Sequence, residues 1–535
     1  MFHTARATHA IAVAPHHLAS QSALAVMRDG GNAIEAMVAA AATIAVVYPH
    51  MNGIGGDSFW IIVPPGGTPI AIDACGQAAL AATIEAYRSR ALAAIPVRGP
   101  LAANTVAGTI GGWNLALEVA AEVGAKSGAR LPLERLLRDA ISYAEDGVPV
   151  TVSQQNATRS KLPELAAQPG FTDTFLIDGA LPLAGQRFRQ PRIARTLSML
   201  VRDGLDSYYR GALATEIAAD LHSVGSLIGS ADLAACRAER KTALRLVHSA
   251  GTVFNMTPPT QGAVSLAILG VLDRVGLAQV EADSADHVHL VVEATKRAFQ
   301  LRDRYITDPA DMTVDAQALL TPENLDSLAA TIRPDQAAPW GNGRGPGDTI
   351  WMGTIDESGL AVSFIQSIYH EFGSGVVLPT TGINWQNRGA SFSLDADHLL
   401  ALKPGKKPFH TLNPAAALLA DGRTMVYGTM GGDGQPQTQA AVFSRYVTFG
   451  QPLQTALTAP RWLLGRTWGQ TSDTLKLEQR FPQSVIDALT ARGHEVEVLL
   501  AFDETMGHAG ALVRHPDGML EGASDPRSDG AVAGY

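Results

Sequence analysis

The dipeptide Asp348-Thr349 constrains this chain more than any other short segment of its sequence. It ends a polar stretch rich in glycine and proline, Pro339 to Gly347, and it precedes two runs with strand character, 350–356 and 360–368. Gly and Pro mark loops, whereas β-branched and aromatic residues favour strands. The sequence therefore predicts a hairpin whose first strand begins with a threonine, directly after a flexible linker.

A threonine in this position has two interpretations. The linker could simply enter a hairpin. Alternatively, the chain could be cut before Thr349, which would give that residue a free α-amine beside its own hydroxyl. Such an amine has a pKa of about 7.7 to 8, so it can act as a general base near neutral pH and activate the hydroxyl as a nucleophile. Motifs elsewhere in the chain favour the second interpretation.

The composition is that of a globular protein with a large core, since 46% of the 535 residues are hydrophobic and 17% are charged. The net charge of −10 gives no electrostatic footprint for nucleic acid. Two distant cysteines, Cys75 and Cys236, exclude a disulfide framework and a cysteine-based zinc site. The apolar run 36–48 is too short to span a bilayer, and no secretory signal is visible. We therefore expect a cytoplasmic enzyme without a membrane or nucleic-acid partner.

The hydrophobic pattern predicts a mostly helical first half and a second half richer in strands. Helices are expected at 20–29, 33–47 (capped by Asn32), 110–123, 132–146, 191–204, 211–224, 231–237, 261–275, 284–303, 434–449 and 482–492. Strands are expected at 59–63, 70–72, 350–356, 360–368, 413–420, 424–428, 474–477 and 495–501. This mixture favours a layered α/β architecture, with one candidate boundary at 335–348.

Two glycine-rich segments could carry chemistry. The segment Gly53–Ser58 fits neither a phosphate loop nor a dinucleotide-binding turn, so a tight turn between a helix and a strand is favoured. The segment Gly428–Gly434 follows a predicted strand and precedes a predicted helix. Its backbone N–H groups could form an anion site or an oxyanion hole, or the segment could be a plain turn.

Two clusters of titratable residues and one single arginine could form sites. His287, His289 and Glu293 lack the HExxH pattern of a zinc enzyme, so buried, hydrogen-bonded histidines are favoured over metal ligands. The basic cluster is favoured as a solvated or ion-paired helix face; it comprises Lys296, Arg297, Arg302 and Arg304. Arg388 could hold a carboxylate through two hydrogen bonds, or it could be an ordinary surface cation. We expect no metal and no cofactor.

Several motifs, in their order along the chain, resemble the γ-glutamyltransferase family of N-terminal-nucleophile hydrolases. The matching segments are Gly30–Ala36, Pro49–Gly56, Thr105–Gly112, Ala144–Val150, Gln190–Pro191, Ala231–Leu233, Pro258–Pro259, Glu293–Phe299, Asp348–Thr349 with Asp356, Phe372–Gly375, Asn413–Pro414 and Gly431–Gly432. The resemblance implies a four-layer αββα fold and a proenzyme cut before Thr349. The large subunit, 1–348, and the small subunit, 349–535, would share one intertwined core and could assemble into a heterotetramer.

The resemblance also implies roles for individual residues. Thr349 would first attack the carbonyl carbon of Asp348, and water would hydrolyse the resulting ester. The released Thr349 would then attack substrate amides, with its α-amine as the base. Gly431 and Gly432 would form the oxyanion hole, and Ser367 would supply a second hydroxyl that supports the nucleophile.

The departures from the family pattern bear on the substrate. Positions that hold the α-amino and α-carboxyl groups of glutamyl substrates read Tyr369, Arg388, Ser391, His410 and Thr411, and the early arginine has no counterpart near Asp73–Gly76. Loss of an anion and gain of a cation favour a carboxylate substrate that has no α-amine, because an unpaired buried charge rejects the wrong substrate. Bulky Tyr369 and His410 would also make the pocket smaller.

This pattern, with the stretch 363–375, resembles the oxamate amidohydrolase branch of the family, which acts in purine-ring catabolism. The expected reaction is hydrolysis of oxamate to oxalate and ammonia through an ester on Thr349. Arg388, helped by His410 or Thr411, would hold the carboxylate. The alternatives are a γ-glutamyltransferase or glutathione hydrolase, and an unprocessed, non-catalytic member of the family.

Overall fold

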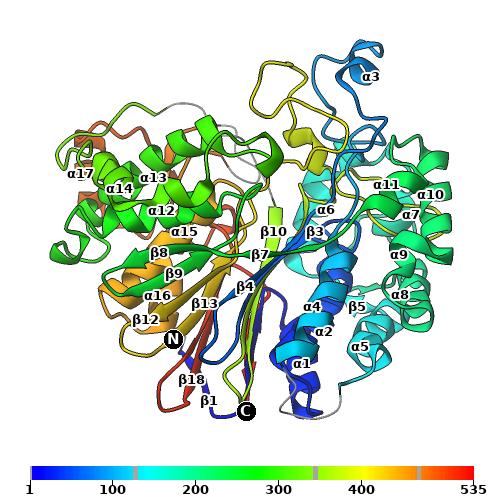
Figure 1. The fold of residues 1–535 in the computed structure, drawn as a ribbon, viewed down its shortest axis with the longest axis horizontal. Coiled ribbons are helices and arrows are strands. Elements are labelled where there is room, and N and C mark those ends of the chain that lie inside the picture. Colours follow the sequence, from blue (N-terminus) through cyan, green and yellow to red (C-terminus); the bar gives the residue numbers. More distant parts are fainter. Residues whose placement is uncertain (1–2, 124–129, 341–347, 467–471) are drawn as a thin grey trace.

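A computed structural model describes residues 3–123, 130–340, 348–466 and 472–535, with only the backbone of Asp348. Two seven-stranded sheets lie face to face in the centre of the molecule, and helices cover the outer face of each (Figure 1). The predicted four-layer αββα fold is confirmed. The predicted linker at 335–348 lies largely outside the described residues.

Strands from distant parts of the chain alternate in both sheets. The first sheet has the order β19 (Ala531–Gly534), β2 (Ile11–Ala14), β10 (Asp348–Ile355), β11 (Ala361–Tyr369), β3 (Asp57–Val63), β4 (Ile70–Ala74) and β7 (Glu239–Thr242). The second has the order β1 (Ala5–Ala7), β18 (Leu520–Ser524), β17 (Ala509–Arg514), β13 (Thr424–Thr429), β12 (Ala415–Leu419), β9 (Gly251–Asn255) and β8 (Leu244–His248). Segments before and after position 348 are therefore paired with each other in each sheet.

Helices flank the two sheets on opposite sides (Figure 1). The first sheet is covered by α1 (His17–Arg28), α2 (Ala33–Val47), α4 (Thr109–Val123), α5 (Leu133–Asp146) and α8 (Pro191–Asp203). The second is covered by α12 (Gly262–Leu272), α13 (Ala285–Tyr305), α14 (Pro322–Ala329), α15 (Gly434–Phe443) and α16 (Leu453–Thr458). Among the described residues, no helix has the length and apolar character needed to cross a membrane.

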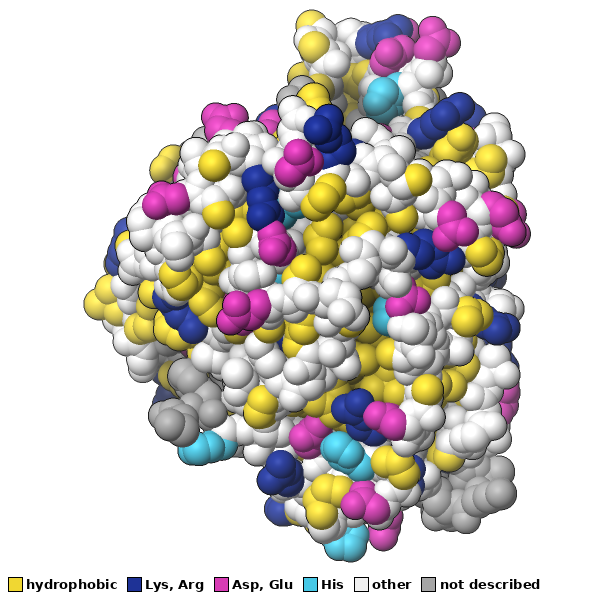
Figure 2. Space-filling view, turned by 90° about the vertical axis from the view of Figure 1, so that its left-hand side faces the viewer, with side chains coloured by type: hydrophobic (Ala, Val, Ile, Leu, Met, Phe, Trp, Pro, Cys, Tyr) yellow, Lys and Arg dark blue, Asp and Glu magenta, His cyan; other side chains and the backbone are white. Residues whose placement is uncertain are grey.

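Smaller elements complete the fold. A three-stranded sheet of β14 (Trp462–Leu464), β15 (Leu475–Glu478) and β16 (Val496–Leu499) carries α17 (Gln483–Ala491). The remaining elements are α3 (Ile84–Arg88), α6 (Val152–Leu165), α7 (Phe171–Phe175), α9 (Ser207–Arg210), α10 (Ala212–Val224), α11 (Ser230–Ala235), β5 (Val148–Pro149) and β6 (Arg187–Phe188). On the face shown in Figure 2, acidic and basic side chains are interspersed.

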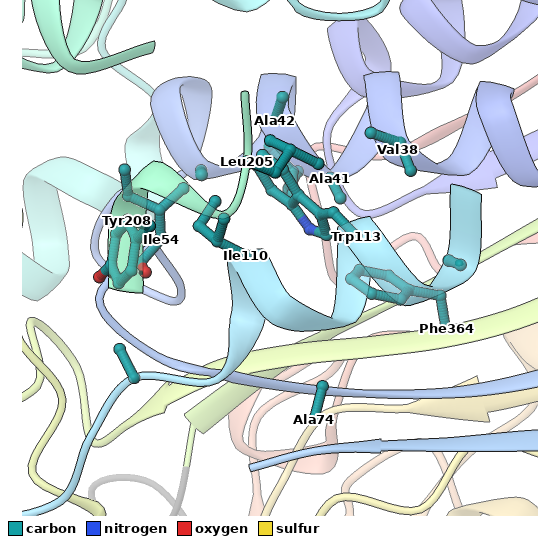
Figure 3. Close-up of a cluster of buried hydrophobic side chains, with 14 of the residues drawn as sticks. Val38, Ala41, Ala42, Ile54, Ala74, Ile110, Trp113, Leu205, Tyr208 and Phe364 are labelled. Carbon is teal, nitrogen blue, oxygen red and sulfur yellow. Dashed lines mark hydrogen bonds between the residues drawn. The ribbon is translucent and has the colours of Figure 1, made fainter. Parts of the chain in front are cut away.

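Helix α2 begins and packs as its sequence predicts. The Asn32 side chain accepts hydrogen bonds from the backbone N–H groups of Ile34 and Glu35, and the Glu35 carboxylate accepts one from the N–H of Asn32. Every residue of α2 is buried, because the helix lies between the first sheet and the outer helices. Figure 3 shows Trp113 of α4 against the small side chains of Ala41 and Ala42.

The interface between the sheets fixes the position of β10. Trp351 points from β10 toward the second sheet, and its indole N–H donates to Ser363 Oγ at 2.9 Å. A Cβ atom at Gly428 would lie 2.2 Å from Trp351 Cδ1, and one at Gly510 would lie 2.5 Å from Cζ3. Only glycine therefore leaves room for the indole at these two positions. This packing holds the strand that begins at Asp348.

The predicted elements are present, with ends displaced by a few residues, but several strands and several helices, among them α6, α14 and α16, were not predicted. Strand β2 has four residues and is buried throughout, so it shows no alternating pattern. Strands β17 and β18 contain the small residues that the sheet interface requires. The helix predicted at 434–449 is α-helical only to Phe443, and a π-helical turn, Ser444–Thr448, follows it.

Candidate active site

Thr349 lies in β10, opposite an irregularity in β11. The register of the two strands shifts between Asp348 and Ile350, because two residues of β11, Ser367 and Ile368, face Thr349 in a β-bulge. Bulges redirect side chains out of the regular alternation and are common beside active sites. Thr349 is buried, and its Oγ1 lies 3.5 Å from Nε2 of Gln435, at the start of α15. The predicted nucleophile therefore faces the N-terminus of a helix.

Ser367 lies on β11, the strand next to that of Thr349. Its hydroxyl accepts a hydrogen bond of 2.8 Å from the N–H of Tyr369, and its ladder partner on β3 is Asp57. Tyr369 ends the strand with a φ of 82°, a left-handed conformation that is an outlier for a bulky residue. Such strain is found at functional sites, and here it accompanies the turn of the chain away from Thr349.

The predicted oxyanion residues form a tight turn at the start of α15. Gly431 has a φ of 119° and Gly432 a φ of 52°, conformations that favour glycine. The N–H of Gly434 donates to the carbonyl of Gly431 at 2.7 Å, and that of Gln435 donates to the carbonyl of Gly432 at 3.2 Å. Because the Gln435 side chain also reaches the Thr349 hydroxyl, this glycine turn lies beside the first residues of β10.

A buried polar network, formed by Gln261 and Arg302, contacts the glycine turn. The side-chain amide of Gln261 donates to the carbonyls of Gly432 and Thr411, both at 2.9 Å. Arg302 Nη1 lies 2.7 Å from Asp433 Oδ1, and neither side chain is exposed. The sequence pattern identified none of these contacts, because the partners come from distant segments.

The basic cluster on α13 is ion-paired, not solvated, at its two most buried positions. Lys296 Nζ lies 2.7 Å from Glu293 Oε1, and Arg302 also pairs with Asp303 at 2.9 Å. Both cations are buried. Of the two interpretations open at the level of sequence, ion pairing therefore describes Lys296 and Arg302.

Arg388 is buried, so it is not a surface cation. The residue begins a short 3₁₀ turn, Arg388–Ser391, and only 1% of it is exposed. Within the part of the chain that the structure describes, none of its three guanidinium nitrogens has a hydrogen-bond partner. The guanidinium carbon lies 3.8 Å from the centre of the Tyr369 ring. Burial lowers the pKa of Arg388 to about 10, which still leaves it charged at neutral pH. A cation of this kind is suited to binding a carboxylate.

Asp57 is the main residue of this site that sequence reasoning missed. Its Oδ1 accepts hydrogen bonds from the N–H groups of Gly76 at 3.0 Å and Gly108 at 2.9 Å. Within the described residues, its Oδ2 makes no hydrogen bond of good geometry, and the nearby Gln386 amide donates to the carbonyl of Val106 at 2.9 Å. Burial raises the pKa of Asp57 to about 7, against the opposing effects of the two N–H donors and of a nearby arginine. The only signal in the sequence was an acidic residue inside a glycine-rich turn.

His410 lies next to Asp57 and Arg388, and Thr411 follows it in the chain. His410 Nε2 lies 3.5 Å from Asp57 Oδ2, and both ring nitrogens lack a hydrogen-bond partner. Burial lowers the pKa of His410 well below its usual range, with a smaller effect from Arg388, so the ring is neutral. The Thr411 hydroxyl is also buried without a partner. We refer to Arg388, Tyr369, Asp57, Gln386, His410 and Thr411 as the Arg388 pocket.

Two links connect the Arg388 pocket to the rest of the site. Tyr369 is the ladder partner of Asp348. The carbonyl of Thr411 shares the amide of Gln261 with the carbonyl of Gly432. Buried polar atoms in proteins are nearly always hydrogen-bonded, so several unpaired ones in one pocket indicate a ligand site. The structure thus places the predicted site residues in three sets: Thr349 and Ser367 on β10 and β11, Gly431 and Gly432 in the glycine turn, and Arg388, Tyr369, His410 and Thr411 in the Arg388 pocket.

The histidines considered as metal ligands are hydrogen-bonded. His287 Nε2 lies 3.0 Å from Ser444 Oγ. Ligand atoms of His289, Glu293 and His494 lie within 4.8 Å of one another. However, His289 Nδ1 bonds to His494 Nε2 at 2.8 Å, and the Glu293 carboxylate is occupied by Lys296. These contacts fit buried, satisfied side chains, the interpretation that the sequence favoured.

Comparison with known proteins places the chain in a family. The model of the family described as Gamma-glutamyltranspeptidase matches residues 19–535. The chain is 65% identical to the oxamate amidohydrolase proenzyme of Klebsiella pneumoniae over 99% of both chains. It is 38% identical to the glutathione hydrolase-like YwrD proenzyme of Bacillus subtilis over 98% of both. A crystal structure of cephalosporin acylase from Bacillus halodurans superposes with a TM-score of 0.91, at 33% identity, over 100% of this chain and 97% of that one. The chain therefore belongs to the gamma-glutamyltranspeptidase family and is an amidohydrolase with the N-terminal-nucleophile hydrolase fold.

Proposed function

We propose that this protein cuts itself before Thr349 and then hydrolyses the amide of a small carboxylate, oxamate, to oxalate and ammonia. The observation that carries the proposal is the buried guanidinium of Arg388, whose three nitrogens lack hydrogen-bond partners. A substrate carboxylate would satisfy them through two parallel hydrogen bonds. The 65% identity to a protein named oxamate amidohydrolase proenzyme supports the same substrate.

Processing would begin when Thr349 Oγ attacks the carbonyl carbon of Asp348. The peptide bond is exchanged for an ester, and the nitrogen of Thr349 becomes a free amine. Water then hydrolyses the ester, which leaves a carboxylate on Asp348 and restores the hydroxyl. The two products, 1–348 and 349–535, would remain together because their strands alternate in both sheets.

Turnover would use the same hydroxyl. The α-amine of Thr349 accepts the Oγ proton as Oγ attacks the amide carbon of oxamate. The N–H groups of Gly431 and Gly432 stabilise the oxyanion that forms, and Ser367 supports the nucleophile. The amide nitrogen takes the proton and leaves as ammonia. Water then hydrolyses the oxalyl ester, so oxalate is released and Oγ regains its proton.

The pocket explains why a small carboxylate would be preferred. Arg388 binds the carboxylate, and the Tyr369 ring, 3.8 Å from the guanidinium carbon, closes one side of the pocket. His410 and Thr411 offer polar hydrogens to the same group. A substrate without a carboxylate would leave the buried cation unpaired, which costs about 1–3 kcal/mol or more.

We also propose a cellular setting. Cys75 and Cys236 are buried free thiols, which suits a reducing cytoplasm. The reaction would belong to purine-ring catabolism, in line with the oxamate branch of the family. We also propose that two copies of the processed pair form a heterotetramer, as the family resemblance implies.

Ammonia release and gel electrophoresis test the proposal together. We expect purified protein to migrate as two fragments and to release one ammonia per oxalate formed from oxamate. Thr349→Ala should remain a single chain and should release no ammonia, whereas Thr349→Ser should cut itself slowly and retain part of the activity. Ammonia release by the uncut Thr349→Ala protein would place the nucleophile elsewhere. A wild-type chain that stays uncut and inactive would favour a non-catalytic role.

One observation favours a second candidate function. Asp57 supplies a buried carboxyl near Arg388, and the two together could hold the α-ammonium and α-carboxylate of a glutamyl group. The 38% identical relative is named as glutathione hydrolase-like. Release of glutamate from glutathione, with no ammonia from oxamate, would support this function and contradict the first.

A further inference from the structure

We infer that Asp57 determines the charge of the substrate that the Arg388 pocket accepts. With the Asp57 carboxyl protonated the pocket binds a small monoanion, and with it ionised the pocket rejects that anion. The inference rests on the proposed function, because it concerns the same pocket. It assigns to Asp57 a role in substrate specificity, separate from the nucleophile and the oxyanion hole.

The first argument is the geometry of the Asp57 carboxyl. Oδ1 is fixed by two backbone donors, from Gly76 and Gly108, so the carboxyl cannot rotate without breaking both bonds. Oδ2 is therefore held in one direction, toward His410, whose Nε2 lies 3.5 Å away. An oxygen held in this way can either donate a proton to a ligand or repel a ligand anion.

The second argument is the charge of the surroundings. The titratable groups that interact with Asp57 from the elements packed against it are Arg388, His410, Cys75, Cys236, Tyr208 and Tyr209. The histidine is neutral, and burial raises the pKa values of the two cysteines and the two tyrosines. Nearby Lys407 is paired with Asp73 at 2.7 Å and Glu239 at 3.2 Å. The net charge of the pocket is thus +1 or 0, depending on Asp57.

The third argument is the interaction between two carboxyl groups. A substrate carboxylate bound to Arg388 lies in the pocket that Asp57 also faces. Two neighbouring carboxylates do not both stay ionised, so one proton is retained between them. Protonated Asp57 would donate its hydrogen to the substrate carboxylate, while Arg388 balances the remaining charge. Burial raises the pKa of Asp57 to about 7, so the proton is present near neutral pH.

The pH dependence follows from this coupling. Below pH 7 the free enzyme already carries the Asp57 proton, so KM for oxamate should be constant. Above pH 7 substrate binding must take up a proton, so KM should rise by up to about tenfold per pH unit. The α-amine of Thr349 titrates in a similar range, but it acts on the chemical step and should affect mainly kcat.

The experiment measures kcat and KM for oxamate from pH 6 to 9 in three proteins. Wild type should show the rise in KM. Asp57→Asn keeps an acceptor for Gly76 and Gly108 and supplies a permanent N–H donor, so its KM should be nearly independent of pH. Glu504→Gln is the matched control, because burial also raises the pKa of Glu504 to about 7, while its neighbours are Ser153, Asp503 and Asp529. This control should keep the wild-type slope.

A flat KM profile in wild type, or an unchanged slope in Asp57→Asn, would overturn the inference. Calorimetry with the product oxalate as the probe gives a second measurement that does not depend on turnover. At pH 8, in two buffers of different ionisation heat, wild type should take up about one proton more per oxalate than Asp57→Asn. Equal uptake by both proteins would also overturn the inference.

These outcomes separate the inference from the proposed function. If wild type releases no ammonia from oxamate at any pH, the proposed function fails, and oxalate calorimetry still tests the coupling at Asp57. If oxamate is hydrolysed with a KM that does not vary with pH, the proposed function stands and the inference fails. If Asp57 instead pairs with a substrate ammonium, Asp57→Asn should lose hydrolysis of glutathione.

Discussion

Two buried clusters of charge in this protein differ in one respect, the pairing of their polar atoms. Arg527 binds both carboxylate oxygens of Glu478, at 2.6 and 2.7 Å, and also Asp525 at 3.0 Å. Arg388 makes no hydrogen bond through any of its nitrogens. Both arginines are at most 4% exposed, so burial alone does not distinguish them.

The presence or absence of hydrogen-bond partners distinguishes an arginine that supports the structure from one that is available to a ligand. The Arg527 cluster, which comprises Arg527, Arg461, Glu478 and Asp525, also holds the chain near the site. Arg461 donates to the carbonyl of Gly507 at 2.8 Å, and Asp525 accepts from the N–H of Ala509, where β17 begins. The Arg388 pocket has no such internal pairing of its cation. Under the proposed function, a substrate carboxylate would pair with this cation. In the free protein we expect the unpaired cation to lower the free energy of unfolding.

Removal of the Glu478 charge should give the largest effect. Glu478→Gln would leave two buried cations, Arg461 and Arg527, with Asp525 as their remaining carboxylate. Breaking a buried ion pair in this way costs about 3–5 kcal/mol. Chemical denaturation should therefore show a loss of that order in the free energy of unfolding. Activity per folded molecule should stay close to wild type, and a loss of stability below about 1 kcal/mol would mean that the two clusters are not as different as their contacts indicate.

The opposite result is expected in the Arg388 pocket. Arg388→Met removes a buried cation that has no hydrogen-bond partner, so the free energy of unfolding should be unchanged or increased. Binding of oxamate should weaken about 100-fold or more, seen as a rise in KM equivalent to about 3 kcal/mol. Arg388→Lys keeps the charge without the two parallel donors. Its KM for oxamate should therefore lie between the values of wild type and Arg388→Met.

Steady-state kinetics and thermal denaturation check this prediction. A lower melting temperature in Arg388→Met would show that the guanidinium stabilises the fold. An unchanged KM would remove Arg388 from the substrate site. Gel electrophoresis serves as the control, because self-cleavage at Thr349 should be retained when only the carboxylate pocket is altered.

Strand β10 could be predicted from the sequence, whereas the Arg388 pocket could be predicted only in part. Thr349 follows a linker and begins a strand, and Asn32 begins a helix; both are local patterns of a few residues. The family resemblance placed Arg388 in the substrate site, although the residue alone was ambiguous. The strand and the helix depend on neighbours in the chain, so the sequence contains enough information to predict them. The role expected of Arg388 depends on known relatives of the protein.

Asp57 and Arg302 could not be interpreted in this way. The donors that fix Asp57 come from two other loops, at Gly76 and Gly108. The partner of Arg302 is Asp433, 131 positions further along the chain. Burial changes the chemistry of both side chains, and burial is a property of the assembled layers. The local pattern therefore suggested a turn residue in one case and left a solvated face open in the other.

The pair Arg302–Asp433 combines features of the Arg527 cluster and of the Arg388 pocket, and its substitution should have the smallest effect. It is fully buried and paired, like the Arg527 cluster, but Asp433 follows directly after Gly432 in the glycine turn. Asp433→Asn keeps an acceptor for Arg302, and Arg302 keeps Asp303, so stability should fall less than in Glu478→Gln. The turn should become less well ordered, and kcat should fall about tenfold, or about 1.4 kcal/mol, with KM nearly unchanged.

Asp303→Asn is the matched control, because Asp303 pairs with the same arginine but is 44% exposed, so kcat should be unaffected. Equal effects of the two substitutions on kcat would contradict this prediction. They would mean that kcat depends on neutralising the charge of Arg302 and not on the position of the glycine turn.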